Sequence, residues 1–297
     1  MTVLRTPDER FDNLPGYDFA ANYADIGGLR MHFVDEGPRD GEVVLLLHGE
    51  PSWSYLYRHM IPPLVAAGFR VIAPDLVGFG KSDKPSRKSD YSYAGHVDWM
   101  RRFIESLDLN DITLFCQDWG SLIGLRVAAE NEQRFARIAV GNGGLPTGDE
   151  ELPRAFFAWR TFARYSPWFP IGKILQKATV TELSDDVIAA YDAPYPSSAY
   201  KAGARAFPML VPTLPDDPAS AANRAAWDVF RNWEKPFLTT VSNRDPITRG
   251  GDIPWQQTVP GATDREHVTI RNAGHFLQED KGPELAEVLI QFVAGER

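Results

Sequence analysis

Three residues of types used in covalent catalysis, Asp118, Asp245 and His275, follow one another along the chain in the order nucleophile, acid and base. An aspartate can attack an electrophilic carbon directly, because a carboxyl group with a reference pKa of about 3.9 is ionised at neutral pH. A histidine oriented by a second carboxylate can then activate a water molecule. The three residues are therefore a candidate set of nucleophile, acid and base.

The nucleophile candidate lies in the segment 112–121, where an apolar strand passes directly into a helix. Small residues stand two positions before Asp118 and two positions after it, namely Cys116 and Gly120. This is the pattern of a nucleophile elbow, a strained turn that exposes one side chain at the carboxyl edge of a sheet. The alternative is an aspartate that caps the following helix. On the first interpretation, the only cysteine of the chain is the small residue of the turn and not a nucleophile.

The acid and base candidates each follow a predicted strand. Asp245 comes after the strand 237–241, and His275 comes after the strand 267–270. Because the carboxyl ends of parallel strands meet at one edge of a sheet, we expect both side chains near Asp118. The other five histidines are interpreted as structural: His32, His48, His59, His96 and His267.

A second loop provides candidate backbone donors. The turn His48-Gly49-Glu50 follows a buried strand at 43–47. Its position predicts that the backbone N–H groups of Glu50 and Trp119 point into one space above the elbow. Such donors stabilise the negative oxygen that forms when an ester is attacked, and they constitute an oxyanion hole.

These residues need a sheet to hold them, and the first half of the chain alternates strand and helix patterns in the way that predicts one. Together with two strands near the end of the chain, the pattern predicts an α/β fold with a mostly parallel sheet and helices on both faces. Strands are predicted at 30–35, 43–47, 70–73, 112–116, 138–140, 237–241 and 267–270, and helices at 54–66, 93–107, 120–130 and 283–292.

The segment 146–227 differs from the rest of the chain in its composition and in its secondary-structure pattern. It shows no strand pattern, and it is rich in aromatic residues, prolines and short helical pieces. We therefore expect a helical cap at 146–227, inserted into a core made of residues 1–145 and 228–297.

Composition excludes several classes of protein. The 297 residues carry 31 basic and 40 acidic side chains, a formal charge of −9, which disfavours nucleic-acid and anionic-membrane surfaces. One cysteine allows neither an intrachain disulfide nor a cysteine-based zinc site. The purest apolar run, 43–47, is far shorter than the ~18 residues of a membrane span. No secretory signal is readable at the start, so we expect a cytoplasmic protein, and we expect a monomer without metal or cofactor.

One motif resembles a phosphate-binding loop and is rejected. The residues GFGKS at 78–82 would need a glycine at position 75, which is Asp75, and they lead into Asp-Lys-Pro instead of a helix. We do not expect nucleotide binding.

Several segments together resemble the haloalkane dehalogenases of the α/β-hydrolase superfamily. They are HGEPSWSYLYR (48–58), DLVGFGKSDKP (75–85), CQDWGS (116–121), SNRDP (242–246), GHFLQED (274–280) and, in the cap, AFFAWRTFARYSP (155–167) and YDAPYP (191–196). The resemblance implies an α/β-hydrolase fold and the hydrolysis of carbon–halogen bonds without a cofactor. Its partners would be a small apolar halogenated substrate, water and a halide ion.

The resemblance also implies a halide site. A halide ion accepts hydrogen bonds, and the tryptophan indole N–H is a donor only. Trp119, next to the nucleophile, is one expected halide ligand, and the family pattern places the second at Trp159 in the cap. Trp168 is the competing candidate, and the Glu50 side chain is a further candidate for the halide pocket.

Three alternatives remain at this stage. An epoxide hydrolase would use the same Asp118 nucleophile with cap tyrosines that protonate the epoxide oxygen. An ester hydrolase is disfavoured because Ser121 lies too late for the elbow, and a ligand receptor with a vestigial site is disfavoured by the complete triad. Glu50 and Trp159 favour the dehalogenase over the epoxide hydrolase. The candidate cap tyrosines are Tyr165, Tyr191, Tyr195 and Tyr200.

Overall fold

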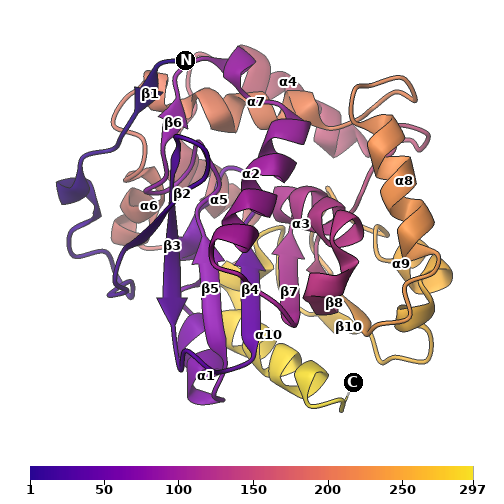
Figure 1. Ribbon diagram of the computed structural model, residues 1–297. Helices are drawn as coiled ribbons and strands as arrows, with labels where there is room; N and C mark the ends of the chain where they lie inside the picture. The colour runs from indigo at the N-terminus through magenta and orange to yellow at the C-terminus, as the bar shows by residue number, and fades with distance from the viewer. Residues whose placement is uncertain (297) are drawn as a thin grey trace.

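The structure, a computed structural model, describes residues 1–296, and within them an eight-stranded sheet forms the centre of the molecule (Figure 1). Its strands are β2 (Asn22–Asp25), β3 (Arg30–Glu36), β4 (Val43–Leu47), β5 (Arg70–Pro74), β7 (Ile112–Gln117), β8 (Phe135–Gly141), β9 (Phe237–Ser242) and β10 (Val268–Ile270). They lie in the order β10-β9-β8-β7-β4-β5-β3-β2. Neighbours from β10 to β5 are parallel, whereas β3 is antiparallel to both β5 and β2. The predicted, mostly parallel sheet is confirmed.

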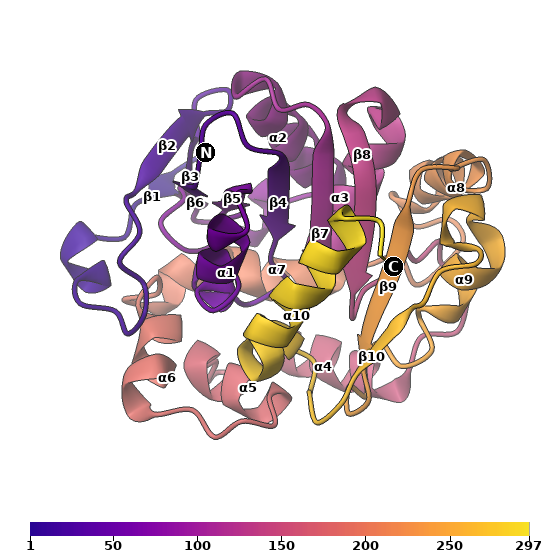
Figure 2. The same ribbon diagram turned by 90° about the horizontal axis from the view of Figure 1, so that it is seen from below.

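Helices cover both faces of this sheet, which explains why its central strands are buried and mostly apolar. Helices α1 (Ile61–Ala66) and α10 (Leu277–Val293) lie on one face, and α2 (Tyr93–Ser106) and α3 (Trp119–Glu130) lie on the other (Figure 2). Every residue of β7 is buried, as are four of the five residues of β4. A short second sheet pairs β1 (Val3–Leu4) with β6 (Lys84–Pro85) in antiparallel orientation.

Five helices fill the segment between β8 and β9, which contains no strand among the described residues, as expected. The first four are α4 (Arg154–Tyr165), α5 (Ile171–Ala178), α6 (Asp185–Asp192) and α7 (Ala202–Leu210), and α4 and α7 lie at the top of Figure 1. Helix α8 (Ser220–Phe230) instead lies beside the core and next to α9 (Ile253–Thr258), and its Asn223 accepts a hydrogen bond of 3.0 Å from Arg126 of α3. The predicted cap boundary at 227 falls inside α8, and the division into core and cap stays a prediction.

Two predicted helices differ in the structure. The single helix predicted at 54–66 is a 3₁₀ turn at Ser54–Tyr57 followed by α1. Pro62 and Pro63 lack the N–H groups that would continue a helix through this stretch, and they occupy the first turn of α1 instead. The closing helix begins at Leu277 and not at Pro283, and its dihedral angles break at Lys281 (φ −144°, ψ 36°), just before that proline. The remaining predicted elements are present, with ends that differ by one to three residues.

No helix among residues 1–296 is long and apolar enough to cross a membrane.

Candidate active site

Asp118 occupies the sharp turn between β7 and α3, with φ 50° and ψ −124°. A positive φ is costly for a residue with a side chain, and surrounding bonds must hold it. The Asp118 N–H donates to the carbonyl of Asn142 (3.1 Å), and its own carbonyl accepts from the N–H of Ser121 (2.9 Å). A side chain at Gly120 would overlap the carbonyl oxygen of Leu47, so only glycine lets α3 start this close to β4. The predicted elbow geometry is present, and the Asp118 side chain caps no N–H of α3.

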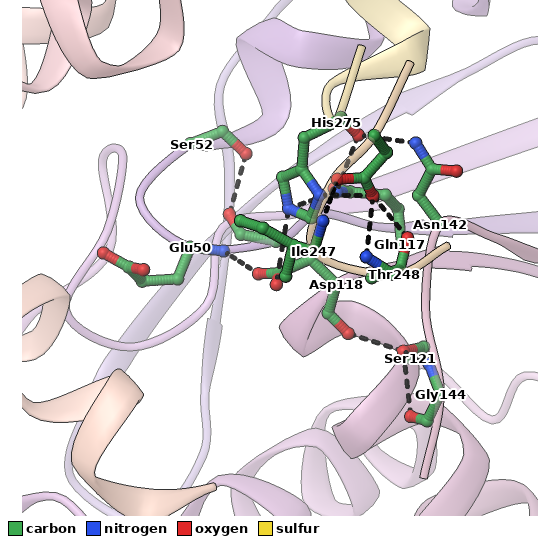
Figure 3. Close-up of polar contacts among 12 residues, drawn as sticks. Glu50, Ser52, Gln117, Asp118, Ser121, Asn142, Gly144, Ile247, Thr248 and His275 are labelled. Carbon is green, nitrogen blue, oxygen red and sulfur yellow. Dashed lines mark hydrogen bonds and ion pairs between the residues drawn. The ribbon is translucent and has the colours of Figure 1, made fainter. Parts of the chain in front are cut away.

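The loop after β4 brings a backbone donor to the same carboxylate. The N–H of Glu50 donates to Oδ1 of Asp118 at 2.7 Å (Figure 3). Gly49 permits this approach, because a side chain there would overlap the Cβ atom of Asp118. The backbone N–H of Trp119, the other expected donor, forms no hydrogen bond with the Asp118 carboxylate within residues 1–296.

His275 connects the two aspartates. Its Nδ1 lies 2.9 Å from Oδ2 of Asp245, and its Nε2 lies 3.5 Å from Oδ2 of Asp118. Asp245 is 1% exposed, and it also accepts hydrogen bonds from the N–H of Ile247 (2.8 Å) and from the hydroxyl of Thr248. In Figure 3 the His275 ring and the Glu50 N–H approach the Asp118 carboxylate from different sides. The structure therefore brings all three predicted triad residues together.

Electrostatics in this group favour a protonated histidine while Asp118 is ionised. Burial lowers the pKa of His275, but the charge of Asp245 and hydrogen bonds to Asp118 and Asp245 outweigh burial and raise the pKa to about 10. Burial in turn raises the pKa of Asp245, but the charge and hydrogen bond of His275 outweigh it and lower the pKa to about 2. His275 is thus favoured as a cation between two carboxylates.

Two buried amides that support His275 were not predicted from the sequence. Asn142, directly after β8, donates from Nδ2 to the carbonyl oxygens of Gly274 (2.9 Å) and His275 (3.0 Å). Gln117, directly before the nucleophile, places its Nε2 at 3.2 Å from both the carbonyl oxygen and Nε2 of His275. Asn142 follows a central strand and Gln117 ends one. A polar residue at the carboxyl end of a central strand is the feature of the sequence that could have identified them.

The candidate halide ligands lie in different environments. Trp119 is 3% exposed, its ring centroid is 4.4 Å from that of Phe207 in α7, and its indole N–H donates to no protein atom within residues 1–296. Trp159 of α4 is half-buried and stacks on Phe169 at 5.6 Å. Trp168 is 62% exposed, so it lies on the outside of the molecule.

The Glu50 side chain is buried close to this group. Burial, followed by the charge of Asp118, raises the pKa of the Glu50 carboxyl well above its usual value, and a hydrogen bond from Trp159 offsets only part of the rise. Its Oε1 atom has no hydrogen-bond partner within residues 1–296. Its surroundings therefore favour the neutral form of this carboxyl more than water does, and its contact with Trp159 places that tryptophan beside the Glu50 loop.

Comparisons with known proteins agree with this geometry. Residues 42–282 match the family described as alpha/beta hydrolase fold. The chain is 57% identical to a haloalkane dehalogenase of Psychrobacter cryohalolentis over 99% of this chain and 98% of that one, and 57% identical to one of Mycobacterium marinum over 98% and 100%. The chain belongs to the haloalkane dehalogenases. The solved structure of a haloalkane dehalogenase from Paraglaciecola agarilytica, described as tetrameric, superimposes with a TM-score of 0.91, is 38% identical, and covers 97% of both chains.

The contacts of the four candidate tyrosines also bear on the epoxide hydrolase alternative, which needs free tyrosine hydroxyls at the site. Tyr191 donates to Glu279, Tyr195 donates to the carbonyl of Pro51 (3.3 Å), and Tyr200 donates to the carbonyl of Arg5 (3.5 Å). The fourth, Tyr165, is 69% exposed. Three of the candidate proton donors are engaged elsewhere and the last points outward, so the tyrosines do not favour epoxide opening.

No group of three or more His, Cys, Asp or Glu side chains within residues 1–296 is arranged to hold a metal ion.

Proposed function

We propose that this protein hydrolyses small apolar haloalkanes to an alcohol and a halide ion through a covalent ester on Asp118. One observation carries the proposal: the Asp118 carboxylate lies between the N–H of Glu50 (2.7 Å) and Nε2 of His275 (3.5 Å). One oxygen of the nucleophile is thus bonded to a backbone donor, while the other faces the base.

In the first step, Oδ2 of Asp118 attacks the carbon that bears the halogen. A carbon–oxygen bond forms as the carbon–halogen bond breaks, and the electron pair leaves with the halide. The indole N–H groups of Trp119 and Trp159 are the proposed donors to that ion, because an N–H group that cannot accept suits an anion. Support for Trp159 comes from its contact with the Glu50 carboxyl.

In the second step, a water molecule hydrolyses the ester. Esterification removes the charge of Asp118, one of the groups that raise the pKa of His275, so the histidine can lose its proton and act as a base. His275 takes a proton from water, and the hydroxide adds to Cγ of Asp118. The negative charge develops on Oδ1, opposite the Glu50 N–H and the proposed second donor, the Trp119 N–H. Collapse breaks the ester bond, the alcohol takes the proton from His275, and Asp245 stabilises the imidazolium throughout.

Trapping the ester tests this scheme. The variant His275→Phe, incubated with 1,2-dibromoethane, should release about one equivalent of bromide and then stop, since only the second step needs the base. Mass spectrometry should find the alkyl group on the peptide that contains Asp118. The exposed histidine variant His59→Phe is the matched control and should turn over normally. An unmodified Asp118 peptide in the His275 variant would reject the two-step scheme.

A screen with a pH indicator separates the substrate classes. Haloalkanes such as 1-bromobutane should release acid in the presence of the protein, and epoxides should be consumed slowly or not at all. The core and cap division, a monomeric state and a cytoplasmic location remain proposals. Light scattering of the purified protein tests the monomer against the tetramer described for the P. agarilytica relative.

A further inference from the structure

The loop that carries His275 is bonded on one side to the core and on the other side to the segment after α5. Its carbonyl groups face the core, where Asn142 donates to both Gly274 and His275. Its N–H groups face away. The N–H of His275 donates at 2.8 Å to the carbonyl of Ala178, the last residue of α5. The catalytic loop is thus held between the two parts of the chain.

The carboxylate of Asp280, in the first turn of α10, binds both the His275 loop and the segment after α5. It accepts hydrogen bonds from the N–H of Val180 (2.9 Å), the N–H of Thr181 (2.7 Å) and the N–H of Gly274 (2.8 Å). The first two donors follow α5, and the third directly precedes His275. Helices α5 and α10 lie next to each other in Figure 2, in agreement with the hydrogen bonds from Val180 and Thr181 to Asp280.

Close packing at the same point limits how far the loop can move. A side chain at Gly274 would overlap the carbonyl oxygen of Ala178, so the two backbones are in contact there. The adjacent Glu279 also connects α10 to the inserted segment. Its carboxylate pairs with Arg58 through two bonds of 2.6 Å and accepts from the hydroxyl of Tyr191 in α6. Two consecutive carboxylates at the start of α10 therefore bind two parts of the inserted segment, the residues that follow α5 and helix α6.

We propose that Asp280 is a positioning residue that holds His275 in place for hydrolysis of the ester on Asp118. The inference rests on the proposed function. Alkylation needs the carboxylate of Asp118 and the halide donors, none of which Asp280 contacts. Hydrolysis also needs Nε2 of His275 at a fixed distance from a water molecule and from Cγ of Asp118. Loss of the Asp280 carboxylate leaves three N–H groups without their acceptor and frees the loop, so it should slow the second step selectively.

Single-turnover kinetics of the full-length protein test the proposal. Asp280→Ala is mixed with 1,2-dibromoethane and quenched at intervals, and the fraction of alkylated Asp118 peptide is measured by mass spectrometry. A displacement of the base by about 1 Å should slow ester hydrolysis on the order of 10- to 100-fold. The alkylation rate and halide quenching of tryptophan fluorescence should not change, so the alkyl-enzyme accumulates. Glu284→Ala, an exposed acidic residue on the same helix, is the matched control and should behave as the parent protein.

A purely structural role would give a different pattern. In that case Asp280→Ala would lower the melting temperature, while the ratio of the hydrolysis and alkylation rates stayed the same below it, and the proposal would be overturned. Asp280→Asn keeps one acceptor oxygen and should slow hydrolysis less than Asp280→Ala does; an equal or larger effect would contradict the hydrogen-bonding role. If His275→Phe traps the ester but Asp280→Ala leaves the rate ratio unchanged, only the positioning role fails. If neither variant forms an ester, the proposed function fails as well.

Discussion

The Nε2 atom of His275 lies 3.5 Å from Oδ2 of Asp118, so the proposed base is in direct electrostatic contact with the proposed nucleophile. Burial lowers the pKa of His275, and the interactions with Asp245 and Asp118 together raise it to about 10. Asp118 is the only one of these two carboxylates whose charge disappears during the proposed reaction. The nucleophile thereby controls when its neighbour becomes a base.

Removal of the Asp118 charge should therefore lower the pKa of His275. We expect Asp118→Ala to reduce that pKa by about 1 to 3 units, the usual effect of an opposite charge at this separation. Titration of the His275 ring by NMR measures the shift. The same variant should lose halide release by a factor on the order of 10⁴ or more. Asp228→Ala, a change at a side chain that is 74% exposed, should alter neither quantity. A His275 pKa that stays the same in Asp118→Ala would contradict the coupling.

The spatial grouping of Asp118, Asp245 and His275 could be predicted from the sequence because it is set by short segments. Each catalytic candidate directly follows a strand, and parallel strands bring their carboxyl ends to one edge. The elbow around Asp118 also carries its own local signal in the small residues Cys116 and Gly120. Neither inference needed the position of any distant helix.

The supporting contacts could not be predicted in this way. The carboxylate of Asp280 bonds to residues about 100 positions earlier, and the Glu50 carboxyl interacts with Trp159 of the inserted segment. Such contacts depend on how the helices between β8 and β9 lie on the sheet, which periodicity does not encode. The helix predicted across 54–66 was wrong for a local reason, since Pro62 and Pro63 interrupt it.

The second halide donor is predicted to be Trp159 and not Trp168. Trp159→Phe should weaken quenching of tryptophan fluorescence by bromide, because the variant loses one indole N–H next to the Glu50 loop. The loss of one hydrogen bond to a charged group corresponds to a reduction in halide affinity on the order of tenfold. Trp168→Phe is the matched control, because that side chain is 62% exposed and should not affect the binding constant. The reverse result, with Trp168 as the sensitive position, would reassign the donor.

Glu50 should make halide binding weaken as pH rises. Burial and the Asp118 charge raise the pKa of the Glu50 carboxyl well above its usual value, so its neutral form persists to higher pH, and its ionisation adds a negative charge beside Trp159. Asp118, His275 and Tyr195 also interact electrostatically with this carboxyl. Because their own ionisation could change halide binding, the test compares the parent protein with a Glu50 variant at each pH.

The comparison uses Glu50→Gln, which keeps the shape of the side chain and removes its ionisation. In a titration from about pH 6 to 9, the parent protein should lose more bromide affinity than the variant, because only the parent can gain a negative charge at position 50 as the pH rises. The negative charge that the parent protein gains near the ion should make the difference in bromide affinity on the order of tenfold. Glu284→Gln, on the surface of α10, should follow the parent protein. Identical pH curves for the parent and Glu50→Gln would show that Glu50 stays neutral or lies too far from the ion.

Asp75 should contribute to stability in a pH-dependent way. It directly follows β5, is fully buried, and accepts hydrogen bonds from the N–H groups of Ser54 (2.8 Å) and Lys81 (2.7 Å) while its Oδ2 lies 2.8 Å from Nδ1 of His32. Burial raises its pKa, but the charge and hydrogen bond of His32, the charge of His48 and the Ser54 bond outweigh burial and hold the pKa well below the ordinary value.

A carboxyl whose pKa is lowered by folding stabilises the folded state above its ordinary pKa of about 3.9, and this contribution is lost as the pH falls through the lower pKa of the folded state. Asp75→Asn should therefore reduce the free energy of unfolding at neutral pH by about 1 to 3 kcal/mol, as expected when a buried charged acceptor that is hydrogen-bonded to several donors is replaced. Urea unfolding followed by circular dichroism measures the difference, which should shrink below about pH 3.9. The exposed variant Asp40→Asn controls for the loss of a negative charge. A destabilisation that is the same at every pH would show that Asp75 acts through packing and not through its charge.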